Sequence, residues 1–415
     1  METLLRSMGM LIAFAAPTPE PISKTPAQLG ISLGYPTLVA EQTGHLWFPK
    51  IEVLPGGRLQ VGCSGQPDRG ETSGAFQTTS TDQGKTWVPL APWRYGGVTS
   101  WNEGNLQVGL PWDYTYDNDV RTALRGELVA VDGSGKNIEL PRRNVQITGF
   151  PRPLAQPSHG HTSSFTTDCD GVVIEGKRIL SLGYGTFAGD EEKHRKGNRS
   201  KDAYFGYSLI AIESLDGGRN WRYLTTVCDW THWENNPSWV DRGRFEGPCE
   251  SSLVKLADES LLAVYRTGMF EQNPIHQSIS ADGGKTWSAP KALPAFSVLP
   301  SLQKLSNGAL ILATGRPGIW LWYSADGRGE TWEPIDAMAH HNAVVEQDHP
   351  EWSITLTKAF NRFHTTSNVR IREIAPGKLF LIYDRIPMDW QPVPKDSPER
   401  NRIFVLPIEV GSATR

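Results

Sequence analysis

The sequence predicts an all-β fold, and three observations support this prediction. The 415 residues include 41 glycines, 30 prolines and 15 tryptophans, a composition rich in turn-forming and aromatic residues. Apolar periodicity of the helical kind is nearly absent. A turn motif of the form Ser-x-Asp recurs four times along the chain. The hydrophobic fraction of 38% is sufficient for a large core, so general disorder is excluded.

The turn motif has the same layout in each copy. It occupies residues 80–87, 214–221 and 280–287, and a fourth copy at 324–332 carries one extra residue. The aspartate can cap local backbone N–H groups, the glycine accepts a positive φ, and the terminal tryptophan can pack under the next strand. Each copy therefore predicts a hairpin turn.

A second repeat consists of an apolar residue, turn-forming residues and a run rich in leucine, isoleucine and valine. Its five copies begin at residues 54, 174, 256, 305 and 374. Each predicts a tight hairpin that leads into a buried strand, and the two repeats together make a four-stranded antiparallel sheet. Residues 100–150 supply a further unit. The sequence therefore predicts one six-bladed β-propeller domain over residues 29–412, closed when residues 402–410 pair with an early segment.

Composition excludes several classes of partner. The 41 basic and 45 acidic side chains give a net charge of −4, without the basic excess of a nucleic-acid-binding protein. The four cysteines form no CxxC pair, and we expect no disulfide framework, metal or cofactor. No apolar run approaches the ~20 residues that span a bilayer. Residues 1–28 are expected to be a leader or a short secretory signal, which favours a secreted or periplasmic location over a cytoplasmic one.

With these repeats, residues 44–410 resemble the sialidase (exo-neuraminidase) superfamily, whose turn motifs are called Asp-boxes or BNR repeats. The resemblance implies a six-bladed propeller with an active site at its central axis. That site uses three arginines for the substrate carboxylate, a tyrosine nucleophile with a glutamate partner, and an aspartate acid/base. The boxes lie on the outer edge of such propellers, so a structural role is implied for Asp82, Asp216, Asp282 and Asp326.

Two segments resemble the family's site. Glu250, followed 16 residues later by Arg266, is similar to the glutamate strand and the second arginine, and this separation fits adjacent strands joined by a hairpin. The resemblance implies that Glu250 is a base, while Arg266 and its neighbour Tyr265 bind substrate. Arg316 is similar to the third arginine. A guanidinium can hold a carboxylate through two hydrogen bonds.

Two positions depart from the family. Lys50 stands near the place of the first arginine, and its ammonium is a point charge rather than a fork. Residues 368–384 align with the tyrosine strand, which puts Asn368 in the tyrosine's place and Asp384 on the strand's terminal acid. An amide cannot attack an anomeric carbon. The sequence therefore predicts either attack by water with inversion or a substrate other than sialic acid, rather than a covalent tyrosyl intermediate. Asn368 is expected to contact substrate.

The remaining candidates lie in loops. Asp68 and Glu71 precede the first turn motif and are the candidates for the acid. His159 and His161 would share one side of an extended segment, as a proton-transfer pair, half of a metal site, or hydrogen-bonded loop residues. No carboxylate stands at ligand spacing from them, so we do not predict a metal site.

The leading hypothesis is a sialidase-like glycoside hydrolase that acts on a glycan bearing an acidic sugar, with Arg266 and Arg316 holding the carboxylate. One alternative is a polysaccharide lyase for uronate-containing glycans, in which one of the two histidines, Tyr184 or Tyr207 removes a proton. The other alternative is a propeller that binds glycans without catalysis. The expected ligand is an acidic carbohydrate in the first two cases.

Overall fold

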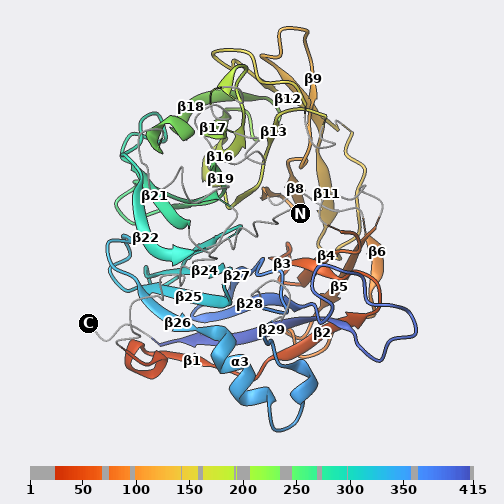
Figure 1. The fold of residues 1–415 in the computed structure, drawn as a ribbon. Helices are drawn as coiled ribbons and strands as arrows, with labels where there is room; N and C mark the ends of the chain where they lie inside the picture. The colour runs from red at the N-terminus through yellow and green to blue at the C-terminus, as the bar shows by residue number, and fades with distance from the viewer. Residues whose placement is uncertain are drawn as a thin grey trace, which may run out of the picture.

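The computed structural model describes residues 24–67, 74–93, 99–141, 143–157, 162–190, 193, 206–233, 245–268, 273–296, 298–356 and 363–411. Their strands form sheets arranged around a common centre, in the manner of a β-propeller (Figure 1). The all-β class predicted from the glycine- and tryptophan-rich repeats is confirmed.

The sheets follow the order of the chain. The first contains β3 (Trp47–Val53), β4 (Leu59–Ser64), β5 (Ala75–Ser80) and β6 (Ala91–Trp93). A three-stranded sheet follows, with β7 (Ser100–Glu103), β8 (Leu106–Gly109) and β11 (Val129–Asp132). The largest contains β9 (Thr115–Tyr116), β10 (Leu124–Glu127), β12 (Asn144–Thr148), β13 (Phe165–Thr166), β15 (Val173–Glu175), β16 (Arg178–Gly185), β17 (Ser208–Ser214) and β18 (Trp221–Asp229).

Three further sheets complete the ring. The first of them has β14 (Cys169–Asp170), β19 (Phe245–Lys255), β20 (Leu261–Gly268), β21 (Pro274–Ser280) and β22 (Lys291–Phe296). The next has β23 (Ser301–Lys304), β24 (Leu310–Gly315), β25 (Ile319–Ser324) and β26 (Glu333–Asp336). The last has β1 (Ile31–Leu33), β2 (Thr37–Gln42), β27 (Arg370–Ala375), β28 (Lys378–Arg385) and β29 (Asn401–Val410).

The prediction of six equivalent blades is wrong. Among the described strands, five sheets have four or more strands, and these are the full blades. Residues 100–150 do not make a sixth, because their strands are divided. β7, β8 and β11 form the small sheet, whereas β12 pairs in parallel with the outer strand β18 and brings β10 and β9 with it.

The ring closes as the sequence predicts. β29 pairs with β28 on one side and with the early strands β1 and β2 on the other. Figure 1 shows this as red and blue strands lying side by side. The last blade therefore takes strands from both ends of the described chain, which ties those ends together.

Each Ser-x-Asp turn is stabilised by its own aspartate. In the third copy, Asp282 Oδ1 accepts from the Ser280 hydroxyl at 2.9 Å and from the Thr286 N–H at 2.9 Å. The Gly284 N–H donates to the Ser280 hydroxyl, also at 2.9 Å. Gly284 has φ 87°, and a Cβ there would lie 2.5 Å from Leu180, so glycine is required. The turn aspartates therefore act locally on the backbone.

One helix was not predicted. α3 (Ala337–Val345) follows β26, and the short 3₁₀ helices η1 (Pro26–Leu29), η2 (Trp230–Trp233) and η3 (Pro350–Trp352) lie in connections. Asp336 caps α3 by accepting from the Ala339 N–H at 2.8 Å. Among the described residues, no helix has the length and apolar character to cross a membrane.

Candidate active site

The strand that leads into each hairpin motif lies nearest the centre, where β3, β14, β19, β23 and β27 contact one another. Side chains alternate along a strand, so every second residue before the turn can face the axis. The residues six before the motif, here called the upper tier, are Phe48, Asp168, Glu250, Leu299 and Asn368. Those four before it, the middle tier, are Lys50, Asp170, Ser252, Ser301 and Arg370. Those two before it, the lower tier, are Glu52, Val172, Val254, Gln303 and Arg372.

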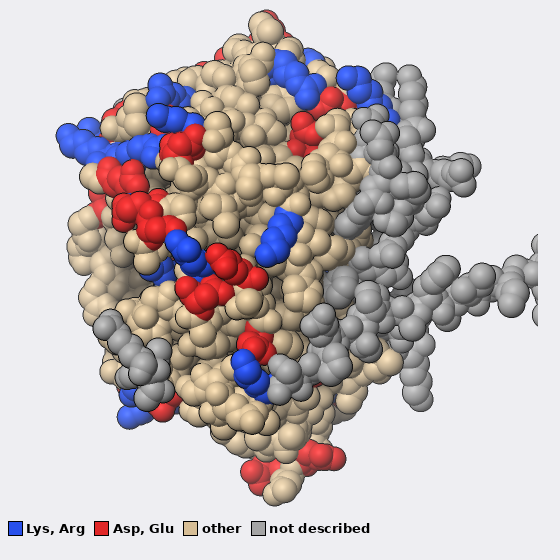
Figure 2. All heavy atoms as spheres, turned by 90° about the vertical axis from the view of Figure 1, so that its left-hand side faces the viewer, with Lys and Arg blue, Asp and Glu red and all other residues tan. Residues whose placement is uncertain are grey.

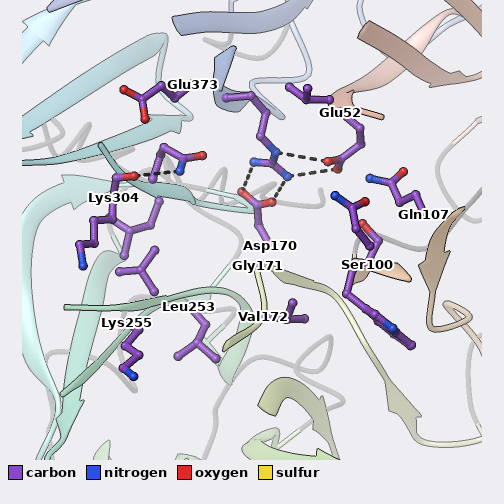
Figure 3. Close-up of a pocket in the computed structure, with 17 residues that line it drawn as sticks. Glu52, Ser100, Gln107, Asp170, Gly171, Val172, Leu253, Lys255, Lys304 and Glu373 are labelled. Atoms are coloured by element: carbon purple, nitrogen blue, oxygen red, sulfur yellow. Dashed lines mark hydrogen bonds and ion pairs between the residues drawn. The ribbon is translucent and has the colours of Figure 1, made fainter. Parts of the chain in front are cut away.

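Contacts between sheets support this arrangement in the middle and lower tiers. Arg372 binds Asp170 through Nη1 at 3.1 Å and Nη2 at 2.5 Å, and its Nε and Nη2 donate to Glu52 at 3.3 and 3.1 Å (Figure 3). The Ser301 hydroxyl also donates to Asp170. Burial alone would raise the pKa of Asp170, but Arg372 and Arg370 outweigh burial and lower it. This carboxylate is therefore paired and unsuited to proton donation.

In the upper tier, Glu250 is held beside a cation. Its Oε2 lies 2.8 Å from Arg266 Nε and accepts from the Leu299 N–H at 2.7 Å. Arg266 Nη2 lies 3.2 Å from Glu246 Oε2, and the Arg266 side chain is 10% exposed. The expected position of Arg266 on the strand next to Glu250 is confirmed, because Cys249 pairs with Arg266 across β19 and β20. Its guanidinium, however, binds two glutamates of the same sheet.

The sequence did not single out Asp168, which is the second upper-tier carboxyl. It is 1% exposed, and neither oxygen has a hydrogen-bond partner among the described residues. Burial, and then the negative charge of Glu250, raise the pKa of Asp168 to about 8, against the opposing effect of Arg370 and Arg266. Asp168 is therefore protonated at neutral pH and able to donate a proton.

Lys50 and Arg370 lie in the middle tier and interact electrostatically with Asp168. Lys50 is 6% exposed, and burial lowers its pKa to about 8. Its Nζ lies 4.9 Å from the centre of the Trp93 ring. Arg370 Nη1 donates to the Leu299 carbonyl at 3.0 Å. The structure thus places Lys50 at the axis, where the sequence placed a substitute for the family's first arginine.

Two tyrosines lie near the carboxyl pair. The Tyr184 and Tyr207 rings meet edge to face, with centroids 4.9 Å apart. Burial raises the pKa of both hydroxyls well above the usual value, and the charge of Asp168 adds to the effect on Tyr184. Neither tyrosine is therefore suited to be the base of an elimination, which was one alternative from the sequence.

Arg316 and Asn368 share one backbone acceptor. Arg316 Nη2 and Asn368 Nδ2 both donate to the Thr366 carbonyl, each at 3.2 Å. The Arg316 guanidinium lies 5.4 Å from the centre of the Trp390 ring, which packs on Phe48 of the upper tier at 5.7 Å. The described contacts therefore do not join Arg316 and Arg266 in one carboxylate-binding pair.

The expectation that Tyr265 binds substrate is corrected, and the structure shows what Asp384 contacts. Tyr265 is 0% exposed and shares a hydrogen bond of 2.8 Å with Ser278, so its role is in the core rather than in substrate binding. Asp384 is the residue that aligns with the acid at the end of the family's tyrosine strand. It is 0% exposed and accepts from both the N–H and the hydroxyl of Thr366, at 2.8 and 2.6 Å. It organises the loop that holds Asn368.

Four candidates lie outside the described residues: Asp68, Glu71, His159 and His161. Their roles stay predictions. Within the described part of the chain, no group of three His, Cys, Asp or Glu side chains is placed to bind a metal ion.

Residues 200–359 match a family model described as "BNR repeat-like domain". The match contains the second, third and fourth Ser-x-Asp turns. This part of the chain is similar to BNR repeat-like domains. The expected similarity to BNR repeats is thereby confirmed over these residues. A search of curated proteins gave no match.

Solved structures share the fold of this BNR-repeat propeller at low sequence identity. A protein of unknown function from Dyadobacter fermentans is 14% identical, with 92% of this chain and 100% of that chain covered and a TM-score of 0.60. The Penicillium chrysogenum alpha-L-arabinanase, complexed with arabinobiose, is 15% identical over 91% and 99% of the two chains, with a TM-score of 0.53. The Fusarium graminearum alpha-L-arabinofuranosidase, complexed with an iminosugar inhibitor, is 10% identical over 92% and 99%, with a TM-score of 0.50.

Proposed function

We propose that the protein is a glycoside hydrolase in which Asp168 protonates the leaving oxygen and Glu250 is the charged carboxylate that assists cleavage at the anomeric carbon. The observation that carries this proposal is the unequal environment of the two upper-tier carboxyls. Asp168 is buried without a hydrogen-bond partner among the described residues, whereas Glu250 is held by Arg266 and a backbone N–H. Glycosidases commonly use one protonated and one charged carboxyl in this way.

A neutral sugar fits this site better than an acidic one. Arg266, the arginine expected to hold a substrate carboxylate, lies between Glu246 and Glu250, and Arg372 lies between Asp170 and Glu52. These acids already neutralise the guanidinium groups. The arabinanase and the arabinofuranosidase that share the fold are named for arabinose, an uncharged sugar, which agrees with this choice.

The acidic-sugar hypothesis is the second candidate. Lys50 and Arg370 are two middle-tier cations whose charges act on Asp168, and an anionic sugar near Asp168 would be attracted by them. On this hypothesis, substitution of Lys50 by Met raises KM for an acidic glycoside and leaves KM for a neutral glycoside unchanged.

The proposal is tested by incubating the full chain with neutral and acidic polysaccharides and aryl glycosides, and measuring new reducing ends. Asp168→Asn and Glu250→Gln should each lower kcat about 10²- to 10⁴-fold. Exposed Asp119→Asn and Glu103→Gln are matched controls and should keep full activity. Release of an ultraviolet-absorbing unsaturated sugar would instead show elimination, and binding without turnover would show a non-catalytic propeller.

Two finer predictions belong to this proposal. The anomer formed first, observed by NMR, tests inversion, since inversion requires that water rather than a carboxylate attacks the sugar. Export, predicted from residues 1–28, is tested by N-terminal sequencing of the protein recovered outside the cytoplasm.

A further inference from the structure

A cavity of about 380 Å³ lies at the lower-tier end of the axis. Its lining comes from the innermost strands of several sheets and from β7 and β8 of the small sheet (Figure 3). The lower tier lies four residues along the strand from the upper tier, which at about 3.3 Å per residue is roughly 13 Å. The Arg372–Asp170–Glu52 network lines the cavity on the side that faces the upper tier. The cavity is therefore separate from the proposed active site.

Most of the charge around this cavity is already neutralised. Lys255 pairs with Glu175 at 3.1 Å and also with Glu259. Glu373 accepts from the Ser306 hydroxyl at 2.7 Å and from the Gly377 N–H at 2.8 Å. Arg372 is bound by Asp170 and Glu52, as described above. Glu373 and Lys304 are thus the charged lining residues that form no ion pair with another described residue, and because they are of opposite sign the cavity offers no cluster of like charges for an ionic ligand.

Two polar side chains remain available on opposite sides of the cavity. The Gln107 amide and the Lys304 ammonium make no hydrogen bond or ion pair with another described residue, although the Lys304 backbone carbonyl accepts from Gln303 Nε2 at 3.0 Å. Figure 3 shows the two residues across the cavity from each other. An amide supplies both donors and an acceptor, and an ammonium supplies three donors. Val172 and Leu253 add apolar surface to the same lining. Polar groups facing each other beside apolar patches match the hydroxyl edges and C–H faces of a sugar.

We propose that this cavity is a second, non-catalytic binding site for a neutral mono- or disaccharide. Its volume is near the lower end of the range for small-molecule sites, which suits a ligand of that size. The carboxylates at its floor are paired with Arg372, and the lowered pKa of Asp170 keeps that group charged, so the site can bind a sugar but lacks an acid to cleave it. The inference does not depend on hydrolysis by the upper tier.

The test is calorimetric titration of full-length Asp168→Asn protein with arabinobiose, xylobiose, cellobiose and maltose, in which turnover cannot interfere. The number of bound sugars and their affinities are compared with those of a triple variant that also carries Gln107→Leu and Lys304→Met. Lys85→Met replaces an exposed lysine of the first turn and is the matched control. Melting temperature shows that each variant is folded.

The expected result is the loss of one bound sugar, or an affinity at least tenfold weaker, in the folded triple variant only. Unchanged binding in that variant, or no binding of any of the four sugars to the parent, would overturn the proposal. Stronger binding of glucuronate than of the neutral sugars at this cavity would also contradict it. If the triple variant does not fold, Val172→Trp, which fills the cavity, should abolish the same binding component, and retention of that component would count against the site.

Discussion

The Nε atom of Arg266 lies 2.8 Å from Oε2 of Glu250, and the same guanidinium reaches Glu246 at 3.2 Å. These groups come from neighbouring strands of one blade and are largely shielded from water. The contact places a cation directly beside the Glu250 carboxylate near the axis. Because both glutamates already bind this guanidinium, we propose a neutral rather than an acidic sugar as the preferred substrate.

Replacing Arg266 by Met should destabilise the protein by about 3 to 5 kcal/mol, because two buried carboxylates lose their cation. Arg266→Lys keeps the charge and should cost less. Urea denaturation of both variants measures the difference. Equal stability of Arg266→Met and the parent would show that Glu246 and Glu250 do not depend on this ion pair.

The Glu250–Arg266 contact could be predicted because both residues lie in long apolar strands joined by a recognisable hairpin. Asp168 could not, since β14 contains only Cys169 and Asp170 and pairs with β19, about 80 residues away in sequence. A signal was nevertheless present. Asp168 stands six residues before Ile174, as Glu250 stands six before Leu256, so the hairpin spacing places both in the same tier.

The number of blades was also hard to predict, because it depends on pairing between strands that are distant in sequence. Residues 126–131 have the apolar alternation of a strand, and nothing local indicates that β12 will join the outer strand of the following blade. That pairing depends on β18, more than 70 residues later. The number of blades was predicted wrongly because the sequence shows where strands form but not which distant strands pair. The carboxylate-binding role given to Arg266 and Arg316 stays a prediction, and the described ion pairs of Arg266 are with Glu246 and Glu250 of its own sheet.

Activity should fall as pH rises through about 8, because Asp168 then loses the proton that it must donate. Its pKa is raised in the folded state, so its contribution to stability is complete below about pH 4 and is lost as pH rises through about 8. Asp168→Asn should lack this loss. The check is the free energy of unfolding of parent and variant at pH 5 and pH 9. The same change between the two pH values in both proteins would contradict a buried, protonated Asp168.

Arg372→Met should cost about 3 to 5 kcal/mol, because Asp170 and Glu52 are left without their shared cation at the axis. Adding Asp170→Asn to this variant should recover part of the loss by removing one unpaired charge. Thermal or urea unfolding of the single and double variants measures this. If the double variant Arg372→Met/Asp170→Asn is instead less stable than Arg372→Met alone, the two residues do not act as one network.

Asp216→Ala tests the structural role of the turn aspartates. The carboxylate accepts from the Ser214 hydroxyl at 2.9 Å and from the Asn220 N–H at 2.9 Å, so its loss should cost about 1 to 3 kcal/mol. These hydrogen bonds lower the pKa of Asp216 against the effect of burial, so their contribution is lost as pH falls below the unfolded value near 4. Because the turn is distant from the carboxyl pair, kcat should be unchanged. A large fall in kcat in the folded variant would refute the assignment.

The most direct test of Asp168 as the acid compares leaving groups. A dinitrophenyl glycoside departs with little protonation, whereas a sugar or alkyl leaving group requires an acid. We expect Asp168→Asn to lose about 10²- to 10⁴-fold in kcat/KM for the sugar or alkyl leaving group and less than tenfold for the dinitrophenyl glycoside. An equal loss for both leaving groups would contradict the assignment of Asp168 as the proton donor.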